Sequence, residues 1–429
     1  MAERAGGPAS GGLARFAALS FAYFATVGVF APYAPLWFQS LGMSTLAIGA
    51  ISSLQSWTRV VTPYAWGWLG DHTGRRVDLV RLAAAGALLS ALALLGVRAA
   101  VPVAVATVAL FLLNGGVVPL YEATLAHLIQ SGAGIDPARY GRVRVWGSIG
   151  FICAVVAAGA VLERFGIGLF PWLLAALNGL MLVAALRLPR ERAEWHDASA
   201  PAPPVLRRLR EPAVAWFFAS IFFTVLAHAA LYAFFSIYLD ALGYSKAAVG
   251  AFWALAAAAE VVFFWQQGRW FRRLDALQWL QVAALASAAR FALVAGLGAW
   301  PLALLLAQAS HALTFAAHHA ACIDLVQRHF PGRQRGRGQA LYTVLGYGCS
   351  GVLGGIGGGW LIEPAGHAAV FWASAVAALL GFACAWRARR AGRTERPGPR
   401  DSVAPPPAAP APPHGQVPPA PSADRDNPA

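Results

Sequence analysis

Leu41-Gly42-Met43-Ser44 returns further along the chain as Leu242-Gly243-Tyr244-Ser245, at an offset of 201 residues from position 41 to position 242. At the same offset, Ile48-Gly49-Ala50 matches Val249-Gly250-Ala251, and Val60-Val61 matches Val261-Val262. In each copy a short turn with glycine is followed by a long apolar segment. The repeat therefore predicts a chain built from two halves of similar structure.

The composition around this repeat is that of a membrane protein. Of 429 residues, 58% are hydrophobic and only 12% are charged, whereas a soluble domain carries about 25% charged residues. A membrane-spanning helix needs about 20 mostly apolar residues. The sequence predicts an all-α polytopic protein with twelve transmembrane helices in two pseudo-symmetric six-helix bundles, at 14–39, 45–69, 78–97, 101–129, 142–163, 168–188, 212–239, 246–268, 277–298, 301–327, 338–361 and 366–386.

Arginine alternates between the loops on the two sides of these spans. One set of loops contains most of the arginines, while the opposite loops contain only Arg98, Arg164 and Lys246. Because positively charged loops stay in the cytoplasm, both termini are expected inside the cell. This orientation also accounts for the formal charge of +14 without any nucleic-acid partner.

The predicted organisation follows from these spans. Parallel repeats related by an axis along the membrane normal occur in secondary transporters, and a duplication of six spans equates helix 2 with helix 8. The N-terminus lacks the pattern of a removable signal peptide. The divisions are a cytoplasmic N-terminus 1–13, a bundle 14–188, a cytoplasmic linker 189–211, a second bundle 212–386 and a disordered Pro- and Ala-rich tail 387–429.

The charged residues that stand out inside the predicted spans are Arg59, Glu122, Arg144, Glu260 and Arg290. A charge in mid-membrane costs about 2.5–3.5 kcal/mol on insertion scales and usually marks a pathway. At the repeat offset Arg59 corresponds to Glu260, so opposite charges from the two halves are expected near one central cavity. The functional hypothesis is a site for substrate and proton, and the structural alternative is a buried ion pair.

Polar and aromatic side chains extend this cavity at helical spacing. The alternative for the aromatic residues is core packing and anchoring at the membrane interface. The predicted stripes are Ser52, Gln55, Ser56, Arg59 and Pro63 in span 2; Tyr23, Thr26, Phe30, Tyr33 and Trp37 in span 1; Thr224, His228 and Tyr232 in span 7; and His311, Phe315, His318 or His319, and Cys322 in span 10.

The histidines and cysteines do not predict a metal site. Adjacent helical residues such as His318 and His319 point about 100° apart, and the four cysteines have no metal-ligand spacing. One of His311, His318 and His319 can relay protons, because imidazole titrates near neutral pH; the alternative is a hydrogen-bonded interior histidine. No metal, cofactor or disulfide is expected, and a proton gradient would supply the driving force.

The loop after span 2 reads Gly67-Trp68-Leu69-Gly70-Asp71-His72-Thr73-Gly74-Arg75-Arg76. It resembles the signature G-x-x-x-D-(R/K)-x-G-R-(R/K) of the major facilitator superfamily, with His72 in place of the usual basic residue. The resemblance implies the major facilitator fold and alternating access. It also implies a gate motif of Gly67, Asp71, Gly74, Arg75 and Arg76, in which Asp71 meets the arginines.

A narrower resemblance, to lactose permease and its relatives, is carried by the stretch Tyr140 to Phe151 (YGRVRVWGSIGF). It implies that Glu122 and Arg144 bind substrate, and that Glu260, Arg290 and His311 take the roles of the helix 8 Glu, helix 9 Arg and helix 10 His. One position departs from this pattern, because Thr314 stands where the proton-carrying Glu is expected. The lactose permease route of proton coupling is therefore incomplete in this sequence.

Phe30 to Leu41 (FAPYAPLWFQSL), Ile48-Gly49, the Pro63–Asp71 stretch and Ala312-Leu313-Thr314-Phe315 are similar to the 3-phenylpropionic acid transporter group. That resemblance implies proton-coupled symport of a small aromatic carboxylate in the bacterial inner membrane. A sugar or nucleoside symporter is the first alternative, and a membrane-embedded enzyme or receptor is the second. Against an enzyme, the sequence contains no nucleophile–base pair, nucleotide loop or metal cluster.

The predicted partners are a small-molecule substrate, protons and the lipid bilayer. The sequence does not determine the oligomeric state, and a monomer is compatible with it. The predicted substrate ligands are Tyr23, Tyr33, Gln55, Arg59, Glu122, Arg144 and Arg290. The predicted proton-coupling residues are Glu260, Glu122 and His311.

Overall fold

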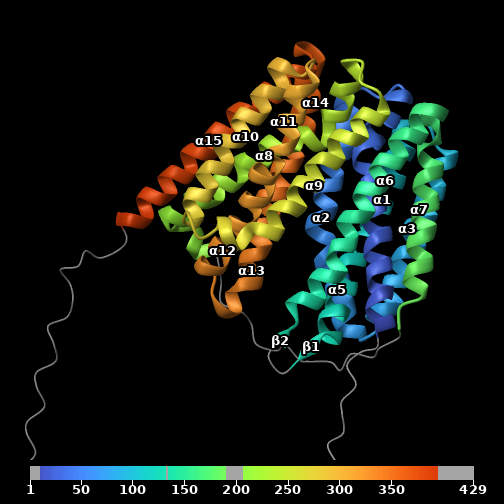
Figure 1. Cartoon of the computed structure of the whole chain (residues 1–429), viewed down its shortest axis with the longest axis horizontal. Coiled ribbons are helices and arrows are strands. Elements are labelled where there is room, and N and C mark those ends of the chain that lie inside the picture. The colour runs from blue at the N-terminus through green and yellow to red at the C-terminus, as the bar shows by residue number, and fades with distance from the viewer. Residues whose placement is uncertain (1–9, 132–133, 190–205, 395–429) are drawn as a thin grey trace, which may run out of the picture.

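Twelve long helices make up the part of the chain that the computed structural model describes, residues 10–131, 134–189 and 206–394 (Figure 1). The first six are α1 (Ser10–Ser40), α2 (Thr45–Thr73), α3 (Arg76–Gly96), α4 (Ala100–Asn114) continued by α5 (Val117–Leu128), α6 (Pro137–Phe165), and α7 (Phe170–Leu186) after the short helix η1 (Ile167–Leu169). A two-stranded antiparallel hairpin, β1 (Gln130–Ser131) and β2 (Gly134–Ile135), joins α5 to α6.

The second set follows the short helix η2 (Leu206–Arg210). Two of its members are interrupted by π-helical segments, η3 and η5, which often mark functional sites. The elements are α8 (Pro212–Ala241); α9 (Lys246–Trp270); α10 (Ala276–Leu297); α11 (Pro301–Ala309) with η3 (Ala312–Ala317) and α12 (His318–His329); η4 (Gly332–Gln334); α13 (Arg335–Leu341) with η5 (Tyr342–Cys349) and α14 (Ser350–Ala365); and α15 (His367–Thr394).

The predicted all-helical membrane fold is confirmed. Ten of the described helices are long and apolar enough to cross a membrane. The other two, α2 and the segment Pro301–His329, are more polar because they carry Gln55, Arg59 and His311, all of which line the central cavity.

Two details of the prediction are corrected. Helix α15 continues to Thr394, past the predicted span end at 386, so residues 387–394 are helical and not part of a tail. The hairpin between α5 and α6 was not predicted, since two-residue strands are too short to produce a periodic pattern. The rest of the predicted tail, most of the linker 189–211 and most of the segment 1–13 lie outside the described residues.

The sequence repeat has the same local structure in both copies. Ser44 and Ser245 each cap a helix, accepting a hydrogen bond from the backbone N–H of Ala47 at 3.2 Å and of Ala248 at 3.1 Å. The glycines before them, Gly42 and Gly243, have φ values of 78° and 84°, a left-handed conformation that favours glycine. The two turns therefore start α2 and α9 in the same way, as the duplication predicts.

Helices α2 and α14 meet through glycine at one end of the molecule. A Cβ atom on Gly49 would collide with the carbonyl oxygen of Gly355, so the two backbones approach as closely as glycine allows. The Ser53 hydroxyl lies 3.0 Å from the Val352 carbonyl oxygen, and the Thr45 hydroxyl donates to the Gly359 carbonyl at 2.9 Å. We call this contact the glycine seam.

A second contact between the halves, at the same end, joins α6 to α9. A Cβ on Gly250 would lie 2.7 Å from the Val155 carbonyl oxygen, again too close for any larger residue. The Lys246 backbone N–H donates to Glu163 at 2.6 Å. These two contacts therefore bring the start of α2 against the end of α14, and the start of α9 against the end of α6.

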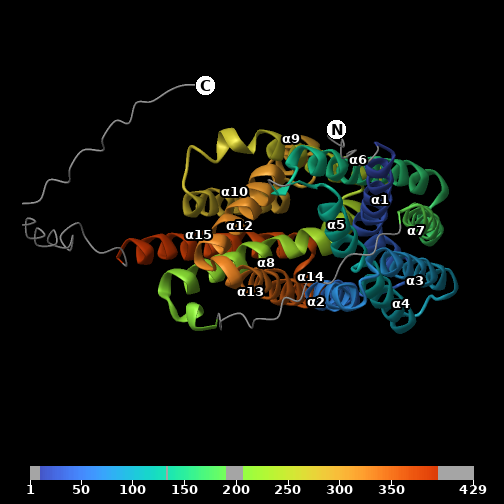
Figure 2. The same cartoon turned by 90° about the horizontal axis from the view of Figure 1, so that it is seen from below.

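The two halves diverge away from these contacts. Figure 1 shows their ribbons meeting near the label of α14 and separating toward α12, α13 and the hairpin. In the perpendicular view, α1 to α7 lie on one side and most of α8 to α15 on the other (Figure 2). Among the described residues, the hydrogen bonds between halves lie at the end of the glycine seam. The start of α1 at Ser10, the end of α15 at Thr394 and the described arginines between α2 and α3 and between α9 and α10 lie at the opposite, open end.

Candidate functional site

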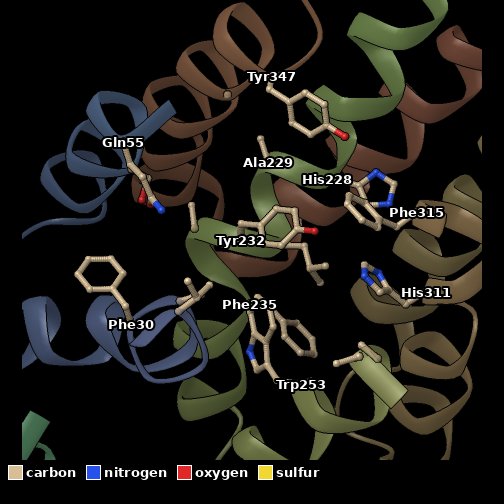
Figure 3. A pocket seen from close by; sticks show the side chains of 18 of the residues that line it. Phe30, Gln55, His228, Ala229, Tyr232, Phe235, Trp253, His311, Phe315 and Tyr347 are labelled. Carbon is tan, nitrogen blue, oxygen red and sulfur yellow. The ribbon is translucent and has the colours of Figure 1, made fainter. Parts of the chain in front are cut away.

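A cavity of about 390 Å³ lies between the two halves. Its walls come from α1, α2 and α6 on one side and from α8, α9, the α11–α12 segment and the α13–α14 segment on the other. Figure 3 shows aromatic and polar side chains pointing into it from both halves. They include Phe30, Gln55, His228, Tyr232, Phe235, Trp253, His311, Phe315 and Tyr347.

The predicted polar face of α2 lines this cavity. Ser52, Gln55, Ser56 and Arg59 all contribute to its wall. Arg59 is exposed to the cavity, and it makes no hydrogen bond or ion pair with any other residue that the structure describes. Its guanidinium can therefore bind an anionic group that enters the cavity.

Arg144 reaches the same cavity from α6 but has partners. Its guanidinium lies over the ring of Phe24, 4.3 Å from the centroid, and its Nε lies 3.9 Å from Oε1 of Glu122. Glu122 does not line the cavity. The structure thus brings the predicted pair together, with Arg144 in the wall and Glu122 behind it.

Glu260 faces the cavity from α9, with about 29% of its side chain exposed. Its Oε2 lies 3.6 Å from Nε2 of His311. The predicted contact of Glu260 with Arg290 or Arg59 is absent from the described residues. The proton-coupling candidate is therefore adjacent to a histidine and not to an arginine.

Arg290 was predicted to bind substrate directly, and the structure places it elsewhere. It is 2% exposed and does not line the cavity. Its guanidinium nitrogens lie 2.9 Å from His311 Nδ1, 3.0 Å from Thr314 Oγ1 and 2.9 Å from Gln308 Oε1. Arg290 therefore positions residues of the wall, and Thr314 serves it as a hydrogen-bond acceptor.

The contact with Arg290 also determines the tautomer of His311. Arginine can only donate hydrogen bonds, so Nδ1 of His311 accepts and the proton of the neutral ring is on Nε2. That nitrogen faces Glu260. The neutral ring therefore presents its Nε2–H to the Glu260 carboxylate, while Arg290 occupies the other ring nitrogen and holds the ring in place.

The two predicted tyrosines are separated. Tyr23 borders a side pocket next to the cavity. Tyr33 is fully buried beside the contact between α6 and α9, where its hydroxyl donates to Val155 O at 2.8 Å and lies 3.3 Å from Lys246 O. Tyr33 therefore belongs to the contact between α6 and α9 and does not line the cavity, because it faces these two helices while Ala34 and Phe38 of α1 face the cavity.

Of the predicted span 10 stripe, His311, Phe315 and His318 line the cavity, whereas His319 and Cys322 do not. Trp253 and Tyr347 line the cavity and were not predicted. His311, Phe315 and His319 form a stack, with ring centroids 5.1 Å and 6.2 Å apart and planes within 7° and 9° of parallel. The wide turn of η3 aligns residues at this spacing, and no sequence pattern identified the π-helical segment. Trp253 and Tyr347 were missed because a single aromatic residue in an apolar span gives no directional signal.

The comparisons with known proteins agree with this geometry. A model of the MFS_1 like family matches residues 13–373. This chain belongs to the MFS_1 like family. It is therefore a multi-pass transporter of the major facilitator type that acts on a small molecule, and it is not an enzyme.

Two relatives of this MFS_1 like protein cover most of its length. It is 29% identical over 363 residues to the "Probable 3-phenylpropionic acid transporter" of Escherichia coli (strain K12). The match covers 84% of this chain and 93% of the relative. It is 28% identical over 380 residues to the maltose permease of Geobacillus stearothermophilus, spanning 84% and 90%. The nucleoside transporter NupG has a similar fold, with a TM-score of 0.74, 17% identity and coverage of 87% and 98%.

The residues of the predicted gate motif form the end of α2 and the start of α3. Gly74 ends α2 with a φ of 62°, and its N–H donates to the Gly70 carbonyl. Arg76 Nη2 lies 2.7 Å from Asp71 Oδ1. The charged contact of Asp71 thus stays within its own loop, which fits a conformation whose halves are apart at this end.

We expect Asp71→Asn to lower the uptake rate several-fold while the protein still inserts in the membrane. The exposed ion pair with Arg76 contributes about 0–1 kcal/mol to stability, so the loss would arise in the state where the two halves close at this end. Uptake into proteoliposomes measures the effect. Asp324→Asn removes a similarly placed pair with Arg328 and is the matched control. Unchanged uptake by Asp71→Asn would show that Asp71 has no role in closing this end.

Proposed function

We propose that the protein is a symporter that moves a small aromatic carboxylate together with protons by alternating access. The observation that carries the proposal is the unpaired guanidinium of Arg59 in a cavity walled by aromatic rings. Arginine binds carboxylates with two parallel charge-assisted hydrogen bonds. Rings such as Phe235 and Trp253 bury an aromatic group through offset or edge-to-face contacts.

The relative from Escherichia coli supports the same substrate class, because it is described as a probable 3-phenylpropionic acid transporter. A substrate with one carboxylate and one ring uses both features of the cavity. The aromatic ring would lie among Tyr232, Phe235 and Trp253, and Gln55 would add a hydrogen-bonding amide beside Arg59.

Glu260 is the proposed proton carrier, and His311 is the group that faces its carboxylate. The protonated Glu260 side chain has no charge, so it can share the cavity with a substrate anion bound at Arg59. Release of the proton restores a carboxylate close to the imidazole Nε2–H of His311. Coupling arises because the two charge states of Glu260 differ in their compatibility with the anion.

The proposed location is the bacterial inner membrane, with both termini in the cytoplasm. Support comes from the arginine-rich loops at the open end of the bundle, since positive loops remain cytoplasmic. In that orientation the conformation described above faces inward. We expect an enzyme reporter that works only in the cytoplasm to be active when fused after residue 429, and a periplasmic signal there would overturn the orientation.

A sugar or nucleoside is the second candidate substrate. The 28% identity to a maltose permease favours a sugar, and Gln55 and Arg144 in the cavity wall offer hydrogen bonds to hydroxyl groups. This candidate leaves the charge of Arg59 without a partner, which is why we rank it second.

Uptake by the purified full chain in proteoliposomes tests these candidates. The assay imposes a pH gradient and compares labelled 3-phenylpropionate, maltose and uridine. We expect accumulation of 3-phenylpropionate only when the gradient is present. Accumulation of maltose or uridine, without that of 3-phenylpropionate, would select the second candidate.

A further inference from the structure

A side pocket of about 70 Å³ lies next to the main cavity, in the N-terminal half. The two spaces share Gln55 and Arg59 in their walls, together with Val27, Phe30 and Ala31. The remaining lining residues are Tyr23, Thr26, Thr58, Leu110, Phe111, Asn114, Gly115 and Leu174. None of these lining residues is acidic, so Arg59 makes the pocket positively charged.

Asn114 is the unexplained residue of this pocket. It is 6% exposed, and its Oδ1 has no hydrogen-bond partner among the described residues. The oxygen and nitrogen of an amide exchange places by a flip and are assigned from their partners. Asn114 can therefore present its NH₂ group to an anion, which would satisfy a buried polar group that otherwise lacks a partner.

A break in the fourth span places Asn114 there. Helix α4 ends at Asn114, and α5 starts at Val117 after two glycines. A Cβ on Gly115 would lie 2.6 Å from Cγ2 of Thr62, so α2 packs directly against the break. The interruption brings the amide next to the helix that carries Arg59.

The other polar groups of the pocket divide into occupied and free ones. The hydroxyls of Thr26 and Thr58 each donate to a carbonyl of their own helix at 2.7 Å. The Tyr23 hydroxyl makes no hydrogen bond with the rest of the described chain. Tyr23 and Asn114, together with Gln55 and Arg59 of the shared wall, are thus the side chains with donors available to a ligand.

We propose that this pocket is the seat of the substrate carboxylate, with Asn114 and Tyr23 completing the site around Arg59. The inference rests on the proposed function and assigns the two ends of the substrate to different spaces. The small charged end occupies the 70 Å³ pocket, and the larger aromatic end stays in the 390 Å³ cavity. The substrate class is therefore an aromatic ring joined to a carboxylate by a short flexible chain.

Equilibrium binding of labelled 3-phenylpropionate to the purified full chain tests the assignment. We expect Asn114→Asp to weaken binding about 100-fold, because the new carboxylate repels the anion and pairs with Arg59 itself. Asn114→Leu, which keeps the size and removes the amide, should weaken it about tenfold, equivalent to about 1.4 kcal/mol. Binding of the uncharged 3-phenylpropan-1-ol should change little in either variant.

The matched control is Asn178→Leu. Asn178 is also a buried asparagine with an unpartnered Oδ1, but it lies on α7 and lines neither space. Its removal should leave affinity unchanged. Thermal unfolding of each variant separates a lost site from a lost fold, and Tyr23→Phe provides a second, smaller test if Asn114→Asp does not fold.

The outcomes distinguish this inference from the proposed function. If Arg59→Gln loses binding but Asn114→Asp, Asn114→Leu and Tyr23→Phe bind like the wild type, the carboxylate lies in the main cavity and the side pocket is not its seat. If the wild type does not bind 3-phenylpropionate at all, the proposed substrate class is wrong. Equal weakening of the acid and the alcohol would also overturn the pocket assignment.

Discussion

Proteoliposomes containing Glu260→Gln should no longer concentrate substrate against its gradient when a pH gradient is imposed, although exchange of internal for external substrate continues. Glutamine has nearly the size of protonated glutamate and cannot release a proton, so the variant stays in the form that tolerates the anion. The ratio of internal to external substrate concentration should fall to about one. Counterflow of labelled substrate, measured without a pH gradient, should persist.

Glu363→Gln is the control, because Glu363 is an exposed acid near the end of α14 and outside the cavity. It should accumulate substrate like the wild type. Continued accumulation by Glu260→Gln would assign the proton to another group, with His311 and Glu122 the next to test. Loss of the protein from the membrane would favour a structural role for the Glu260–His311 contact.

Arg59→Gln should weaken binding of the carboxylate about 100-fold or more. Hydrogen bonds to charged groups contribute about 1.5–3 kcal/mol each, a bidentate pair makes two of them, and about 1.4 kcal/mol corresponds to a factor of ten. Stability should be little affected, since Arg59 has no partner among the described residues. Binding of the labelled acid and thermal unfolding are the two measurements.

Arg59→Lys refines this test, because lysine keeps the charge but not the planar fork. Its affinity should lie between those of the wild type and Arg59→Gln. Arg144→Gln removes the other cavity arginine and, in this proposal, affects the acid less than Arg59→Gln does. If Arg144→Gln had the larger effect, the anion would belong beside Phe24 and Glu122.

The fold was largely predictable because its determinants are local. Runs of about 20 apolar residues mark helices whatever their neighbours are, and the turns at Gly42 and Gly243 repeat in sequence as well as in structure. The polar face of α2 was also predictable, since Gln55 and Arg59 are separated by one helical turn. Charge in an apolar span is informative without any knowledge of packing.

Partners across helices were less predictable, because they depend on rotation and interruption of the spans. Arg290 looked like a ligand by its charge, but its helix turns it toward Gln308 and His311. Tyr33 shares the α1 stripe with Tyr23, but it lies at the closed end of the cavity. Asn114 carries no charge, and only the break between α4 and α5 explains its position.

The glycine seam between α2 and α14 has a consequence for how evenly the protein divides its time between conformations. Glycine has no side chain to order, so parting Gly49 from Gly355 changes little side-chain entropy. The remaining ties, such as those of Thr45 and Ser53, are single hydrogen bonds worth about 0.5–1.5 kcal/mol each. The two conformations should then differ by only a few kcal/mol. A ligand that binds one conformation more tightly by about 5.5 kcal/mol reverses a 1:99 ratio of the two. Binding and release of the substrate can therefore determine how much of the protein is open to each side of the membrane.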